Sequence, residues 1–209
     1  MLQFVMDVFL HLDRHLGEFA NEHGVWTYGF LFAIVFLETG VVITPFLPGD
    51  SLLFACGALA ATGTLHPAAL FGLLTAAAIL GDTVNYSIGK AVGPRAFTGT
   101  VRFLKREHLV RAHTFYERHG GKAIFLARFV PIVRTFAPFV AGIGTMSYPR
   151  FLAYNVAGGV AWVGACLAAG YAFGNIPIVK NNFSVVILGI VAVSLLPLLV
   201  EYLRHRSKT

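Results

Sequence analysis

Charged residues are scarce in this chain. Only 12% of its 209 residues are charged, whereas a soluble domain typically carries about 25%, because its surface faces water. Apolar residues make up 56% of the chain, and the mean hydropathy is +0.71. The shortage of charge excludes an ordinary soluble domain, and the 19 Phe exclude intrinsic disorder. We therefore expect the chain to lie in a lipid bilayer.

Cysteines and cofactor-binding motifs are scarce as well. Two cysteines exclude a disulfide scaffold, and we expect Cys56 and Cys166 to be small buried side chains. No CxxC, HExxH, GxGxxG or P-loop motif occurs in the sequence. The spacing of His108, His113 and His119 fits no common set of metal ligands. We expect neither a metal ion nor another cofactor.

Basic residues gather in one part of the chain. Half of the 16 Lys and Arg residues lie between Lys90 and Lys122, and the net charge is +6. Such a charge can indicate binding to nucleic acid. In a hydrophobic chain the positive-inside rule offers a better explanation, namely a cytoplasmic loop at residues 90–122. The basic tail at residues 204–209 should share that side, and we expect membrane partners and no nucleic acid.

Residues 1–24 have the pattern of an amphipathic helix. Val5, Phe9, Leu12 and Leu16 recur with four- and three-residue spacing. The segment lacks the basic beginning of a signal peptide. Two placements fit the pattern: a helix lying on the membrane surface, and a helix packed beneath the other helices. The sequence leaves both open.

The remaining apolar segments predict an all-α polytopic membrane protein with a single membrane domain at residues 25–203. A membrane-spanning helix needs about 20 apolar residues. Four segments reach that length, and we expect them to be transmembrane helices. They are residues 25–42, 67–89, 151–174 and 183–200.

Two further segments, at about residues 38–65 and 123–144, are apolar but interrupted by residues that break helices. Broken backbone at membrane depth is tolerated only where protein or a wet cavity covers it, so we expect two re-entrant hairpins. With the N-terminus, basic loop and C-terminus all cytoplasmic, the hairpins enter from opposite faces, as in an inverted repeat. The expected hairpin breakers are Pro45, Pro48, Gly49, Pro131, Pro138 and Gly142.

Five ionisable residues fall within these membrane segments: Glu38, Asp50, Asp82, Arg128 and Arg134. Such residues are costly in a membrane and usually mark function, although buried structural ion pairs are the alternative. The planar donor fork of arginine suits phosphate, so Arg128 and Arg134 are candidate ligands of an anionic lipid headgroup. Burial disfavours the charged form of a carboxylate. Glu38 and Asp50 could therefore exchange protons and couple transport to a proton gradient.

Two groups of residues in the expected spans are candidates for contacts between packed helices. Asp82, Asn85 and Tyr86 lie on one helix face, which either lines a cavity or forms a seam between helices; both interpretations stay open. Glycines at 158, 159, 164 and 170 are expected to allow close helix packing.

Two stretches resemble the signatures of a known family. Residues 38–50 read ETGVVITPFLPGD, and residues 127–142 read ARFVPIVRTFAPFVAG. Both are similar to signatures of the DedA family, the bacterial branch of the VTT-domain (SNARE-associated) membrane proteins. The resemblance extends through residues 81–86 and 115–121 and covers nearly the whole chain.

This resemblance implies a multi-pass protein of the bacterial inner membrane with two re-entrant hairpins. Family members are implicated in recycling undecaprenyl phosphate between leaflets, and some depend on the proton motive force; eukaryotic relatives are phospholipid scramblases. The family's functional acids fall on Glu38 and Asp50, and its arginines on Arg128 and Arg134. Many members carry Glu where this chain has Asp50, which puts a proton-coupling role at that position in doubt.

We therefore expect a lipid transporter, with undecaprenyl phosphate, phospholipids and protons as its partners. A nonselective phospholipid scramblase is one alternative. A membrane lipid phosphatase is another, because Ser51 adjoins Asp50, but no nucleophile paired with a base can be identified. An enzyme is thus disfavoured, and a homo-oligomer remains open.

Overall fold

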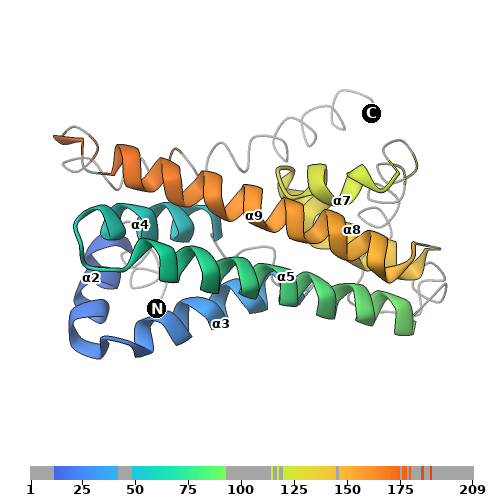
Figure 1. Ribbon diagram of the computed structural model, residues 1–209, viewed down its shortest axis with the longest axis horizontal. Helices are drawn as coiled ribbons and strands as arrows, with labels where there is room; N and C mark the ends of the chain where they lie inside the picture. The colour runs from blue at the N-terminus through green and yellow to red at the C-terminus, as the bar shows by residue number, and fades with distance from the viewer. Residues whose placement is uncertain are drawn as a thin grey trace, which may run out of the picture. The chain divides into compact units, whose positions relative to one another are not determined.

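The computed structural model describes residues 12–41, 49–92, 120–144 and 146–174, with isolated positions between 114 and 189. Within these ranges every regular element is an α-helix, as expected, and no strand occurs (Figure 1). The helices are α2 (Leu12–His23), α3 (Trp26–Gly40), α4 (Gly49–Ala61), α5 (Pro67–Val92), α7 (Lys122–Ala127), α8 (Pro131–Ile143) and α9 (Tyr148–Phe173).

Two of these helices, α5 and α9, are long and apolar enough to cross a membrane. Each has 26 residues and is about 39 Å long, more than the roughly 30 Å of the hydrocarbon core. They run antiparallel: Phe71 lies near Gly164, and Tyr86 stacks on Phe151 with ring centroids 4.4 Å apart. The expected spans at 67–89 and 151–174 correspond to these two candidate spans. The expected span at 183–200, like the tail at 204–209, lies outside the described ranges.

Helix α3 is shorter than the expected span at residues 25–42. It has 15 residues, about 22 Å of helix, which is too short for the hydrocarbon core. It begins beside the start of α5, where the backbone N–H of His66 donates to the hydroxyl of Tyr28 at 2.8 Å. It ends beside the middle of α5, since a Cβ on Gly40 would lie 3.3 Å from the Cα of Gly81. The described helix is therefore shorter than the span predicted for residues 25–42.

Helix α4 returns toward the end of α5 at which α3 begins. It packs on the last turns of α9, where a Cβ on Gly170 would lie 2.0 Å from the carbonyl oxygen of Phe54. After Ala61 a short turn leads into Pro67, the first residue of α5. Gly49, one of the expected breakers, is the first residue of α4. The other two expected breakers of this segment, Pro45 and Pro48, lie outside the described residues.

The course of α3 also bears on membrane orientation. The N-terminal helix α2 precedes α3, which begins beside the start of α5. The basic loop follows Val92, at the opposite end of α5. The prediction that the N-terminus and the basic loop share one side requires the segment that begins with α3 to cross the membrane.

Helices α7 and α8 pack against each other around a break at residues 128–130. Val130 is extended, with φ −119° and ψ 105°, and Pro131 is the first residue of α8. A helix's first residue needs no hydrogen-bonded N–H, so proline is tolerated there. The predicted break at Pro131 is confirmed.

Pro138 and Gly142, in contrast, lie inside α8, and the prediction that they break the helix is wrong. A proline within a membrane helix is tolerated when neighbouring groups satisfy the carbonyls that it frees. Pro138 removes the hydrogen bond to the carbonyl of Arg134, four residues earlier, and the Asn85 amide donates at 2.8 Å to the carbonyl of the adjacent Thr135. Gly142 allows close packing, since a Cβ there would lie 2.1 Å from the carbonyl oxygen of Tyr86.

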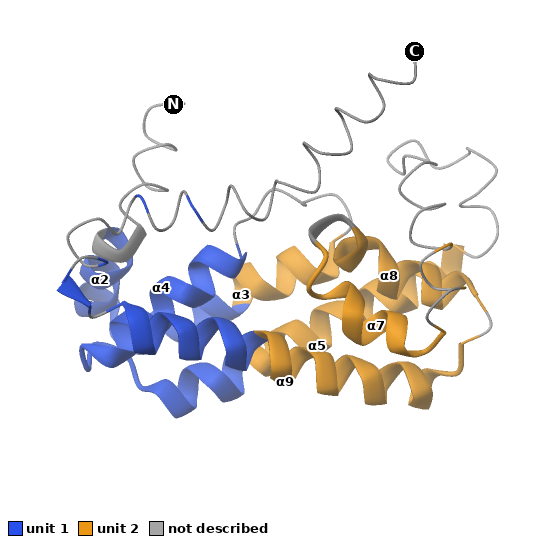
Figure 2. Cartoon of the chain, turned by 90° about the horizontal axis from the view of Figure 1, so that it is seen from above, with its two compact units in different colours: residues 1–32, 48–74, 163–209 blue, residues 33–47, 75–162 orange. Residues whose placement is uncertain are grey.

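The chain forms two compact units (Figure 2). Unit 1 comprises residues 1–32, 48–74 and 163–209, and unit 2 comprises residues 33–47 and 75–162. In unit 1, α2 packs against α4, with Leu16 and Ala20 buried and Gly17 beside Leu59. Of the two placements open for the amphipathic helix, these contacts favour the packed one.

We predict that Gly142→Ala destabilises the protein. The added methyl would overlap the α5 backbone, and overpacking typically costs about 1–3 kcal/mol. Gly72→Ala is a matched control, because a Cβ there meets nothing within 4 Å and alanine favours the helix by up to about 1 kcal/mol. Thermal denaturation of the detergent-purified variants should show a lower melting temperature for Gly142→Ala only. Equal melting temperatures would contradict the close contact.

Candidate functional site

Four charged side chains of unit 2 form two ion pairs. Arg128 Nη2 lies 2.6 Å from Asp82 Oδ2, and Arg134 Nη2 lies 2.7 Å from Glu38 Oε1. Each pair joins an acid from the N-terminal half of the chain to an arginine beside the break between α7 and α8. Four of the five charged residues singled out in the sequence thus meet within one unit.

The Arg128–Asp82 pair is fully enclosed. The side chains are 5% and 6% exposed, and Arg128 also donates to the side-chain oxygen of Asn155. The arginine lies across α9, where a Cβ on Gly158 would come within 2.9 Å of its Cδ. The expected packing role of this glycine is confirmed. Because an ion pair with Asp82, the Asn155 amide and the surface of α9 all hold its side chain, Arg128 has little freedom to move.

In the Arg134–Glu38 pair, the arginine is more exposed than the carboxylate. The Arg134 side chain is 18% exposed and that of Glu38 is 5% exposed. Arg134 lies in the first turn of α8, a position set by the helix start at Pro131. Glu38 lies in the last turn of α3. This arginine is therefore the one better placed to exchange its partner.

Trp162 contacts both arginines. The centre of its ring lies 5.9 Å from Cζ of Arg128 and 5.5 Å from Cζ of Arg134, and the side chain is buried. Both distances allow cation–π attraction. Sequence reasoning missed this residue. The available signal was its place in the middle of a span, whereas tryptophans of membrane proteins gather at the interfaces.

The two ion pairs surround a small cavity. Its volume is about 20 Å³, and Thr39, Thr135 and Trp162 line it together with the four charged side chains. This space holds about one water molecule. A phosphate group does not fit, so the described conformation is closed. The hydroxyl-bearing Thr39 and Thr135, like Asn155, were not identified from the sequence.

The polar face of α5 divides between two roles. Asp82 lines the cavity. Asn85 is fully buried and donates to the carbonyls of Thr39 at 3.2 Å and Thr135 at 2.8 Å. Tyr86 donates to the carbonyl of Met146 at 2.7 Å. The cavity interpretation therefore applies to Asp82, and the seam interpretation to Asn85 and Tyr86.

The other candidate residues are not among those that line this cavity, or they fall outside the described ranges. Asp50 belongs to unit 1, where it occupies the first turn of α4, a favourable place for an acid at a helix N-terminus. Cys56 is buried as expected, and Cys166 is partly buried. His108, His113 and His119 fall outside the residues that the structure describes.

Comparison with known proteins identifies the family. Residues 47–172 match the VTT domain. Protein DedA of Escherichia coli K12 is 53% identical over 209 residues, covering 99% of this chain and 95% of the relative. The chain belongs to the DedA family of VTT-domain proteins. The expectation drawn from residues 38–50 and 127–142 is thereby confirmed.

Other relatives of this DedA-family chain are named as membrane proteins. A membrane protein of Mycobacterium tuberculosis H37Rv is 46% identical over 176 residues, which cover 82% of this chain and 76% of the relative. The inner membrane protein YghB of Salmonella typhimurium is 39% identical over 181 residues, covering 85% and 83%. No solved structure matches the chain. Family and apolar helices together make it a membrane protein.

Proposed function

We propose that this protein moves an anionic lipid, undecaprenyl phosphate or a close analogue, between the leaflets of the bacterial inner membrane. The observation that carries this proposal is the closed cavity of unit 2, where two arginines are paired with carboxylates. Paired charges at membrane depth typically mark a transport path. The protein acts as a transporter, since the lipid headgroup crosses without a bond being made or broken.

Arg134 is the principal ligand of the headgroup in this proposal. Its guanidinium bonds Glu38, is partly accessible and presents a planar fork that matches phosphate oxygens. Arg128 supplies a second positive charge across the cavity while Asp82 and Asn155 hold it in place. The headgroup thus meets one exchangeable and one fixed guanidinium, and its hydrocarbon tail stays in the lipid.

Proton coupling follows from the competition between Glu38 and the phosphate. While Glu38 is charged, it holds the Arg134 guanidinium at 2.7 Å. Protonation of Glu38 removes that attraction and frees Arg134 to bind the anionic headgroup, and loss of the proton restores the pair and expels the lipid.

The closed cavity requires the surrounding helices to move during transport. A volume of about 20 Å³ admits water but no phosphate. The movable elements are the short helices around the break, because α8 starts afresh at Pro131 after the extended Val130. Opening to one leaflet at a time is the usual behaviour of transporters with broken helices near the membrane centre.

A flux assay tests the proposed function. The purified protein is reconstituted into vesicles with a labelled polyprenyl phosphate, and its appearance in the second leaflet is followed with and without a pH gradient. We expect flux that depends on the phosphate headgroup and responds to the gradient, whereas protein-free vesicles show neither. Equal flux of a zwitterionic phospholipid would indicate a scramblase instead, and release of inorganic phosphate would indicate a phosphatase.

Because α3 is short, we propose an orientation in which it does not cross the membrane. With the basic loop in the cytoplasm, the start of α5 and the preceding α2 face the periplasm. In a chain with Cys56→Ala and Cys166→Ala, a membrane-impermeant maleimide should label Glu22→Cys in intact spheroplasts and Lys122→Cys only after lysis. Both positions are exposed, so accessibility does not limit the reaction. If both sites were labelled only after lysis, the N-terminal helix would lie in the cytoplasm, on the same side as the basic loop.

A further inference from the structure

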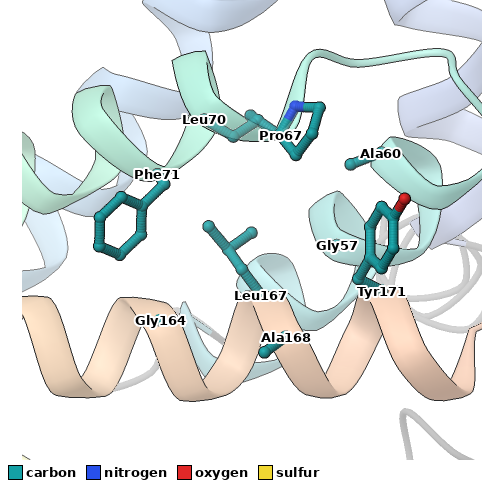
Figure 3. A pocket seen from close by; sticks show the side chains of 9 residues that line it. All are labelled: Gly57, Ala60, Pro67, Leu70, Phe71, Gly164, Leu167, Ala168 and Tyr171. Carbon is teal, nitrogen blue, oxygen red and sulfur yellow. The ribbon is translucent and has the colours of Figure 1, made fainter.

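Unit 1 contains an apolar pocket to which the proposed transport mechanism assigns no role. It lies between α4, α5 and α9 and has a volume of about 360 Å³. Figure 3 shows Pro67 and Leu70 from α5, Ala60 from α4, and Leu167 and Tyr171 from α9 around the same space. The Tyr171 hydroxyl is the one polar side-chain group among the residues that line it.

Small residues create the pocket and let the helices of its floor approach closely. A Cβ on Gly57 would lie 2.3 Å from the carbonyl oxygen of Leu167, so the backbones of α4 and α9 touch. Gly164 and Ala168 leave open the space that larger side chains would fill. Protein interiors rarely contain voids larger than a water molecule, and an apolar cavity does not hold water. A preformed apolar space of this size is therefore suited to an apolar occupant.

The surroundings indicate which occupant that is. The pocket is continuous with the outer faces of α5 and α9, because its own Phe71 and Tyr171 are 38% and 52% exposed. Those two helices are the candidate spans, so their outer faces contact lipid chains in the membrane. Pro67 begins α5, which places the pocket near the membrane–water boundary. The turn just before it exposes the Thr62 and Thr64 hydroxyls.

We propose that this pocket binds one acyl chain of a membrane phospholipid, with the headgroup near the turn at residues 62–66. The acyl chain fills the space between α4, α5 and α9, as an apolar side chain would in the core of a soluble protein. This lipid is a resident of unit 1, and the site is independent of the charged residues proposed to move the transported headgroup.

Photolabelling tests the proposal. The full-length protein is reconstituted in vesicles of phosphatidylethanolamine and phosphatidylglycerol that contain a phospholipid with a diazirine in one acyl chain. After irradiation, peptide mass spectrometry locates the label. We expect it to concentrate on Phe71, Leu167 and Tyr171. Ala168→Phe, which fills the pocket from an exposed position, should reduce this label several-fold.

Ala165→Phe is the matched control, because Ala165 is exposed on the same helix and does not line the pocket. It should leave the labelling unchanged, and both variants should keep the elution profile of the parent. If Ala168→Phe does not fold, Ala168→Leu replaces it. The proposal is overturned by label spread evenly over exposed apolar positions such as Val84 and Ile88, or by equal labelling of both variants. It is also overturned if residues 175–209 or a second copy of the chain cross-links to the pocket in place of the lipid. Flux of the polyprenyl phosphate is measured separately, so failure here leaves the transport proposal standing.

Discussion

Arg134→Gln should weaken binding of a polyprenyl phosphate by about 10- to 100-fold, the equivalent of about 1.5–3 kcal/mol for hydrogen bonds to a charged group. The expected loss follows from the position of Arg134, which pairs with Glu38 and is partly accessible. Glutamine keeps a hydrogen-bond donor but removes the charge. Binding to vesicles of fixed composition, measured with increasing labelled lipid, gives the affinity, and the flux assay should fall in parallel.

Two further variants separate charge from geometry. Arg134→Lys keeps the charge but loses the planar fork, so its affinity should lie between those of the parent and Arg134→Gln. Arg150→Gln removes an exposed arginine at the start of α9 and should bind as the parent does. Parent-like affinity in Arg134→Gln, with the protein folded, would remove Arg134 from the headgroup site.

Glu38→Gln tests the proton step of the same mechanism. In the parent, headgroup binding should strengthen as the pH falls, because protonation of Glu38 releases Arg134. Glutamine resembles the protonated acid, so the variant should bind the lipid at neutral pH about as well as the parent does in acid. The phosphate itself titrates near pH 6, but it does so equally in both proteins. The difference between their pH profiles therefore reports Glu38, and identical profiles would exclude its role in coupling.

The fold shows what periodicity and spacing can and cannot predict. The two spans of α5 and α9 were predictable because each is a continuous apolar run of sufficient length. The apolar run at residues 25–42 was just as clear, yet α3 ends at Gly40 beside the middle of α5. Apolarity shows that a helix is buried in the membrane, but where it ends depends on packing against another helix.

In the candidate site, too, some features were predictable from the sequence and others depend on how the helices pack. Charge in an apolar segment was enough to identify Glu38, Asp82, Arg128 and Arg134, because ionisable groups are rare at membrane depth. Their pairing depends on the fold, as does the contact of both arginines with Trp162. Pro138 was misjudged for a related reason. The Asn85 amide bonds the carbonyl of Thr135, next to the one that Pro138 frees, and it comes from 50 positions earlier in the chain.

Asp82→Asn should destabilise the fold far more than Glu38→Gln does. Removing one partner of a buried ion pair typically costs about 3–5 kcal/mol, because the other charge stays buried without compensation. Arg128 and Asp82 are 5% and 6% exposed, and Arg128 lies against Gly158 with little room to turn toward water. Arg134, at 18% exposed, can reach water more easily when Glu38 is neutralised. Thermal denaturation of the purified variants should rank them parent, Glu38→Gln, then Asp82→Asn.

Replacing both members of the enclosed pair distinguishes a structural from a ligand-binding role for Arg128. Apolar replacement of a complete buried pair is often neutral or stabilising, so Asp82→Leu with Arg128→Met should recover most of the stability lost in Asp82→Asn. The double variant should still translocate lipid poorly, because the cavity then has one positive charge where the phosphate requires two. Recovery of both stability and flux would make the Arg128–Asp82 pair purely structural and leave Arg134 as the sole charged ligand of the headgroup. A failure to recover stability would instead mean that the polar contacts of Arg128 with Asn155 position α9 against α7.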